Sequence, residues 1–156
     1  MDAILATLEA SGAASFFRVS RWGYAALNAT HVFAVALLVG SILPLDARLL
    51  GMFRSVPRDG ALRMLVPFAA TGAFLAATTG ALLFSVRASE YAGLDVFRIK
   101  LLLIAAGLAG AVILHSRDGR LLQHASAARL RIHAVLSIIC WTGALACGRL
   151  IAFAGN

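Results

Sequence analysis

His31 is the residue of this sequence whose surroundings most strongly suggest chemistry. It lies in a long stretch without a formal charge, between Arg21 and Asp46. An ionisable imidazole inside so apolar a segment is costly to bury without a partner, which makes the position a candidate functional site. Imidazole is an axial ligand of haem iron. Lys100 and Arg149, near the ends of two other apolar stretches, would then neutralise the haem propionates.

The alternative interpretation of these three residues involves no cofactor. His31 would share a hydrogen bond with a facing threonine or serine, and Lys100 and Arg149 would extend their long side chains to lipid headgroups. The sequence is compatible with both interpretations.

Polar or small residues recur along one face of each apolar stretch. At ~100° per residue, Tyr24, Asn28 and His31 share a face of the first stretch. Lipid offers such groups no hydrogen-bond partners, so we expect these faces to converge on the interior of a helical bundle. The corresponding faces of the other stretches contain Thr71, Thr78 and Ser85; Lys100, Gly107, Ala111 and His115; and His133, Ser137 and Cys140.

A second candidate site involves His115 and His133, which we expect at the opposite membrane surface from Lys100. Two imidazoles on adjacent antiparallel helices could clamp a second haem or a transition metal. The alternative is that both rings lie in the hydrated interface beside basic loops. His124 lies within such a loop, and we expect it at the solvated surface.

The elements that must position these residues are membrane spans. The chain of 156 residues is 61% hydrophobic and 13% charged, whereas soluble domains are roughly 45–50% apolar. Four stretches, at about 22–44, 64–86, 97–115 and 132–153, are long enough to cross a ~30 Å hydrocarbon core as helices. Residues 1–20 predict a short interfacial helix. The expected fold is all-α, with residues 21–156 forming an up-down-up-down four-helix transmembrane bundle.

Prolines mark two places in these spans. Pro44 and Asp46 are expected to end the first span, and Pro67 is expected in the first turn of the second. Asp46 and Arg48 would form an ion pair that fixes the end of the first helix. A cytoplasmic docking point for a partner is the alternative role for that pair.

Basic residues outnumber acidic ones, 14 to 7. Two loops hold most of the arginines, so the excess indicates cytoplasmic loops in a bacterial inner membrane, with both termini periplasmic, rather than nucleic-acid binding. The expected partner is therefore the lipid bilayer. Small residues would allow close helix packing and a homodimer. The loop arginines are Arg48, Arg54, Arg58, Arg63, Arg117, Arg120, Arg129 and Arg131, and the packing glycines are Gly72, Gly80, Gly107, Gly110 and Gly148.

Motifs of soluble hydrolytic or nucleotide chemistry are missing from the sequence. It contains no phosphate-binding glycine loop, no CxxC and no HExxH. Cys140 and Cys147 stand two helical turns apart on one face, too far for a mutual disulfide.

Segments in all four stretches carry a resemblance. They are SRWGYAALNATHVFAVALLVGSILPLDARLLG, TGALLFS, FRIKLLLI with His115, and SIICWTGALACGRLIAF. Together they resemble a widespread family of small bacterial four-helix inner-membrane proteins of unassigned function. More distantly, the chain is similar to copper-resistance D-type domains and to b-type cytochrome membrane subunits. The resemblance implies a polar and aromatic signature, without His133, at His31, Asp46, Arg48, Lys100, His115, Trp141 and Arg149.

The function expected from these observations is electron transfer by a protein that binds haem b, with a quinone and a redox partner protein. The expected metal ligands are His31 and His115. The alternatives are a transport or copper-handling protein without haem and a purely structural subunit. Candidate cofactor-binding residues are His31, His115, Lys100, Arg149, His133, Asn28 and Tyr24.

Overall fold

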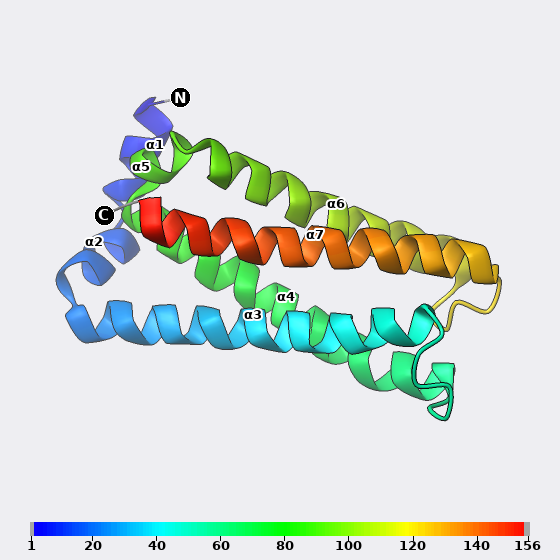
Figure 1. The fold of residues 1–156 in the computed structure, drawn as a ribbon. Coiled ribbons are helices and arrows are strands. Elements are labelled where there is room, and N and C mark those ends of the chain that lie inside the picture. Colours follow the sequence, from blue (N-terminus) through cyan, green and yellow to red (C-terminus); the bar gives the residue numbers. More distant parts are fainter. Residues whose placement is uncertain (1, 155–156) are drawn as a thin grey trace.

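All regular structure in the computed structural model, which describes residues 2–154, is helical. The elements are α1 (Asp2–Glu9), α2 (Gly12–Val19), α3 (Arg21–Leu49), α4 (Arg58–Val86), α5 (Ala88–Ala92), α6 (Asp95–Asp118) and α7 (Ala127–Ala154) (Figure 1). Helices α3, α4, α6 and α7 are each long and apolar enough to cross a membrane. The prediction of an all-α, four-helix membrane protein is confirmed. Residues 1, 155 and 156 of the expected segments lie outside the described residues.

The long helices run alternately in opposite directions, so the two ends of the chain lie at the same end of the bundle (Figure 1). We call this end, which also holds α1, α2 and α5, the terminal end. The opposite end holds the connections at 50–57 and 119–126, and we call it the loop end.

The N-terminal segment forms two short helices where the sequence suggested one. Ser11 separates them and caps α2, because its hydroxyl accepts a hydrogen bond of 3.3 Å from the amide of Ala14. Ser20 caps α3 in the same way through the amide of Gly23, at 3.1 Å. Trp22 is 83% exposed, as befits an aromatic side chain that anchors a helix in the membrane interface.

Hydrogen bonds fasten this N-terminal segment to the connection between α4 and α5. The carboxylate of Glu9 accepts a hydrogen bond of 2.8 Å from the amide of Ser89. The guanidinium of Arg18 donates to the carbonyls of Glu9 and Val86, at 3.0 and 3.1 Å. The bond from the Ser89 amide holds the pKa of the Glu9 carboxyl below its usual value.

The prediction that Pro44 ends the first span is wrong, because α3 continues through Pro44 to Leu49. A proline removes one hydrogen bond from a helix interior, and packing of the turn that follows compensates for this loss. Leu45 and Leu49 are both buried in a cluster with Leu62 and Leu114 at the loop end.

The other spans are also longer than their apolar stretches. Helix α4 begins at Arg58, which puts Pro67 well inside the helix and not in its first turn. Helix α6 continues to Asp118, and α7 begins at Ala127. Apolarity marks the part of a helix that lies in hydrocarbon, whereas backbone hydrogen bonding continues into the headgroup layer. The apolar pattern therefore predicted spans that are too short.

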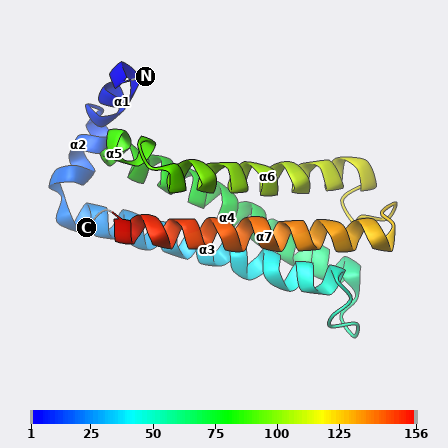
Figure 2. The same ribbon diagram turned by 45° about the horizontal axis from the view of Figure 1, so that its top comes forward.

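The long helices pack as two antiparallel pairs, α3 with α4 and α6 with α7, and the pairs meet along α3 and α7 (Figure 2). Gly72 lets α4 approach α3, since a Cβ there would lie 2.5 Å from the Leu38 nitrogen. Within residues 2–154 the backbones of α4 and α6 form no interface. Aromatic rings bridge these helices at the terminal end, where Phe84 stacks on Phe97 with centroids 5.2 Å apart.

The remaining glycines predicted at helix contacts also face neighbouring helices, which confirms that prediction. A Cβ would lie 3.1 Å from the His31 ring at Gly80, 3.1 Å from the Trp141 ring at Gly107, 3.4 Å from the His133 ring at Gly110 and 3.4 Å from Lys100 Nζ at Gly148. The two candidate histidines His31 and His133 are thus held against glycines of the neighbouring helix.

Candidate functional site

His31 is half-buried on α3 and faces α4. Its Nδ1 lies 2.8 Å from the hydroxyl oxygen of Thr79, which lies 2.6 Å from the carbonyl oxygen of Leu75. A hydroxyl has one proton and a carbonyl only accepts, so Thr79 donates to Leu75 and accepts from His31. In the neutral ring Nδ1 therefore carries the proton, and Nε2 keeps a free lone pair.

Lys100 and two glycines complete the surroundings of the imidazole. The Lys100 side chain is half-buried on α6, close enough to His31 for the two groups to interact electrostatically. Its Nζ lies against Gly148 of α7, while Gly80 of α4 lies against the imidazole. We call His31, Thr79, Gly80, Lys100 and Gly148 the histidine site. All four long helices contribute to it.

Three other predicted residues lie on the outside of the bundle. Arg149 is exposed, and its guanidinium lies 4.8 Å from the centroid of the Phe153 ring. Asn28 and Tyr24 are also exposed. Tyr24 lies beside Tyr91, whose pKa is raised by burial and further by its Tyr24 neighbour. The structure thus turns Arg149 outward, and His31 forms the hydrogen bond to a facing threonine that the interpretation without a cofactor predicted.

The prediction that Thr71 and Thr78 lie on the interior polar face of the second span is wrong. Thr71 and Thr78 are exposed, and Thr78 donates its hydroxyl proton to a carbonyl one turn earlier in α4, at 2.9 Å. A threonine whose hydroxyl is hydrogen-bonded within its own helix can face lipid. A seven-residue spacing of threonines therefore does not identify the buried face of a helix. The sequence signal for Thr79 is the adjacent Gly80, which marks the face that a neighbouring helix approaches.

His115 and His133 are half-buried toward the loop end. Nδ1 of His115 lies 2.9 Å from the carbonyl oxygen of Ala111, to which it donates, and Nε2 of His115 is buried without a partner in the described residues. Nδ1 of His133 is likewise buried and unpartnered there. An unsatisfied buried nitrogen is uncommon in folded proteins, so both rings remain candidates for a role.

The two expected metal ligands, His31 and His115, lie at different depths. Lys100, which is beside His31, precedes His115 by fifteen residues of α6. That separation is about 22 Å along a helix axis. The structure therefore does not bring His31 and His115 together as ligands of one metal.

Asp46 is the residue that sequence reasoning misjudged. It is 3% exposed, its Oδ2 has no partner among the described residues, and its carboxyl faces Ser137 of α7. The predicted ion pair with Arg48 is not formed, because Arg48 Nε donates instead to the carbonyl of Val56 at 2.7 Å. The available signal was the position of Asp46 two helical turns after Val39, on a buried face of α3.

Among residues 2–154, no group of three or more His, Cys, Asp or Glu side chains is arranged to hold a metal ion. Cys140 and Cys147 are both free thiols, in agreement with the prediction that they form no mutual disulfide.

Four apolar spans define the class of this chain as a multi-pass, all-α membrane protein, and its bundle holds a histidine site. No protein-family model matches the chain, and neither a curated protein nor a solved structure matches it significantly. The resemblance drawn from the sequence therefore stays an expectation.

Proposed function

We propose that the protein is a membrane-embedded redox protein in which His31 is the axial ligand of haem b. The observation that carries the proposal is the 2.8 Å hydrogen bond between His31 Nδ1 and the Thr79 hydroxyl. Metal-ligating histidines almost always donate their other ring N–H to an acceptor, which fixes the tautomer and orients the ring. This bond leaves Nε2 of His31 with the lone pair that an iron requires.

The neighbours of His31 support the fit of a haem. Lys100, whose charge acts on His31, brings a cation into the bundle, where it would be a partner for a propionate. Helices α4 and α6, which carry Thr79 and Lys100, form no backbone interface with each other within the described residues. When bound, haem supplies a one-electron couple whose potential depends on its axial ligand and on local hydrogen bonding.

The chain's own residues have distinct roles in this proposal. His31 would hold the iron and Lys100 would neutralise a propionate carboxylate, while Thr79 holds the imidazole in one tautomer. The spans would keep a bound haem within the bilayer, within reach of a quinone. A redox partner protein, a homodimer and a bacterial inner membrane with periplasmic termini belong to the same proposal.

The first prediction concerns colour. Full-length protein purified from haem-replete cells should show a Soret band, and His31→Ala should abolish it because the only proposed axial ligand is removed. His124→Ala is the matched control, since His124 is exposed in the 119–126 connection. A colourless wild-type preparation from such cells would contradict the proposal.

A second candidate function is transport of protons or of a metal ion such as copper without haem. Asp46 favours it, because a buried carboxyl oxygen without a partner inside a span is characteristic of ion and proton pathways. His133 also presents an unpartnered buried nitrogen, one helical turn from the Ser137 that Asp46 faces.

The second prediction tests this candidate in proteoliposomes that contain a pH-sensitive dye or a copper indicator. Wild-type protein without pigment should move the ion, and Asp46→Asn should stop the flux because the titratable group is lost. Asp59→Asn serves as the control, since Asp59 is exposed at the start of α4. Equal flux in wild-type and Asp46→Asn vesicles would rule the candidate out.

A further inference from the structure

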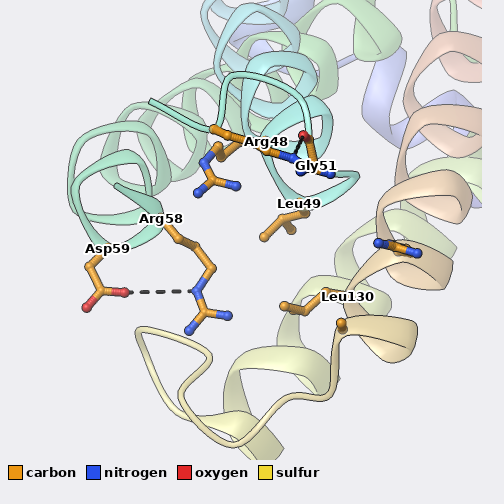
Figure 3. A pocket seen from close by; sticks show the side chains of 9 residues that line it. Arg48, Leu49, Gly51, Arg58, Asp59 and Leu130 are labelled. Atoms are coloured by element: carbon orange, nitrogen blue, oxygen red, sulfur yellow. Dashed lines mark hydrogen bonds and ion pairs between the residues drawn. The ribbon is translucent and has the colours of Figure 1, made fainter. Parts of the chain in front are cut away.

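We propose that the loop end of the bundle binds the phosphate headgroup of an anionic phospholipid. A cavity of about 530 Å³ opens there between the end of α3, the start of α4 and the start of α7 (Figure 3). Its polar lining consists mainly of four arginines, with one acid beside them. These residues are Arg48, Arg54, Arg58 and Arg131, together with Asp59.

The arginines of this cavity, which we call the arginine cavity, are poorly neutralised by the protein. Their only carboxylate partner in the described residues is Asp59, 3.9 Å from Arg58 Nε, a long contact. Arg48 and Arg54 are held through Nε, by the carbonyls of Val56 at 2.7 Å and Gly51 at 3.2 Å. Their terminal Nη groups keep their donors for a ligand. Guanidinium donors match the oxygens of a phosphate in a bidentate geometry.

Two helix starts add to the positive potential of the arginine cavity. Helix α4 begins at Arg58 and α7 begins at Ala127, and both residues line the cavity. Pro57 precedes α4 and provides no capping side-chain hydrogen bond. The first amides of α4 are therefore free donors, and both helix dipoles favour an anion at this place.

An apolar cavity of about 350 Å³ adjoins the arginine cavity and shares Arg48 with it. Its lining is almost entirely apolar and includes Pro44, Phe53 and Met64. Phe53 has φ 49°, a left-handed conformation that is uncommon for a residue with a side chain. A cationic cavity beside an apolar one, at the end of two spans, suits an amphiphile with a phosphate and acyl chains. We therefore assign the site to a phospholipid and not to free phosphate.

The test measures lipid retained by the purified full-length protein, by native mass spectrometry in detergent titrated with phosphatidylglycerol or phosphatidylcholine. We expect clear preference for phosphatidylglycerol. The double variant Arg54→Gln/Arg58→Gln should weaken that binding about 20-fold, because each arginine near a lipid phosphate contributes substantially. Arg63→Gln/Arg120→Gln removes the same charge from exposed residues outside the arginine cavity and should change binding only slightly.

Three results would overturn the proposal. Equal retention of both lipids would show that no anion is selected. Equal loss in the two double variants would indicate diffuse attraction to a basic surface. Displacement of phosphatidylglycerol by millimolar inorganic phosphate, with the same thermal stabilisation by either, would make the cavity a site for soluble phosphate.

A third variant tests the acyl-chain part of the site. Gly60 lines the apolar cavity, and a Cβ at this position would meet no atom within 4 Å. Gly60→Leu should fill space there and weaken binding of long-chain phosphatidylglycerol, while binding of a dihexanoyl analogue is unchanged. An equal effect on both lipids would contradict the assignment of the apolar cavity to an acyl chain.

Discussion

The tautomer and position of the His31 ring depend on two neighbouring residues of α4. One hydroxyl accepts the Nδ1 proton, and the absence of a side chain at Gly80 lets the ring lie 3.1 Å from the position that a Cβ would take. Without Thr79 the ring would have no fixed tautomer. The threonine one position earlier is unable to replace it, because Thr78 is exposed and lies about 100° around α4 from Thr79.

The third prediction follows from this difference between neighbouring threonines. Thr79→Val removes the acceptor while nearly preserving shape, so haem content should fall about tenfold or more, as is typical when a partner of a metal ligand is lost. The midpoint potential of the remaining haem should also shift. Thr78→Val is the matched control and should alter neither quantity. The same haem content and potential in both variants would show that the hydrogen bond does not position His31.

At the scale of helices, close contact between α3 and α4 depends on Gly72. The backbones are so near that a Cβ would lie 2.8 Å from the Leu38 Cα as well as near its nitrogen. This contact sets the rotation of α4 about its own axis and thereby turns Thr79 and Gly80, two helical turns further along, toward His31.

The fourth prediction compares two glycine substitutions in spans. Gly72→Ala should destabilise the protein by about 1–3 kcal/mol, because backbone atoms of α3 must move away from the new methyl group. Gly40→Ala should be neutral or stabilising by up to about 1 kcal/mol, since alanine is the better helix former. A Cβ at Gly40 meets no atom within 4 Å. Thermal or denaturant unfolding in micelles measures the change in stability of each variant, and equal changes would contradict the proposed role of Gly72.

At the scale of the whole molecule, the terminal end is held together across a long distance in sequence. Glu9 accepts from the amide of Ser89, eighty residues later, and Arg18 donates to the carbonyl of Val86. These bonds dock α1 and α2 on the α4–α5 connection. They hold α1 and α2 at the terminal end in addition to the apolar packing between the spans.

The fifth prediction is a pH dependence of this docking. Because the pKa of Glu9 is lower in the folded protein than the ordinary value of 4.5, its ionised form stabilises docking above that value. This contribution is lost as the pH falls through the lowered pKa. Hydrogen exchange of α1 and α2, corrected for intrinsic rates, should therefore accelerate in acid, and Glu9→Gln should remove the pH dependence. The Glu90→Gln variant is the control and should retain the pH dependence, because the Glu90 carboxylate pairs with Arg87, at 3.4 Å. Unchanged protection in acid would contradict the docking role.

The sequence by itself determined the class of the protein and the number of its spans, because burial in hydrocarbon demands long apolar helices regardless of their neighbours. It also identified the packing glycines and singled out His31 and Lys100, since small and ionisable residues are conspicuous in an apolar stretch. Span ends were less predictable, because helices continue beyond the apolar region, as α3 does through Pro44.

Only the tertiary structure decided which groups meet. The partner of His31 lies 48 residues away, and its identity depends on how far α4 is rotated, which no local pattern encodes. The same holds for Asp46, which turns to Ser137 of α7 and away from nearby Arg48. It also holds for the four arginines that three helix ends and the 50–57 connection assemble around one cavity. Periodicity fixes which residues share a face, whereas packing between helices fixes what that face touches.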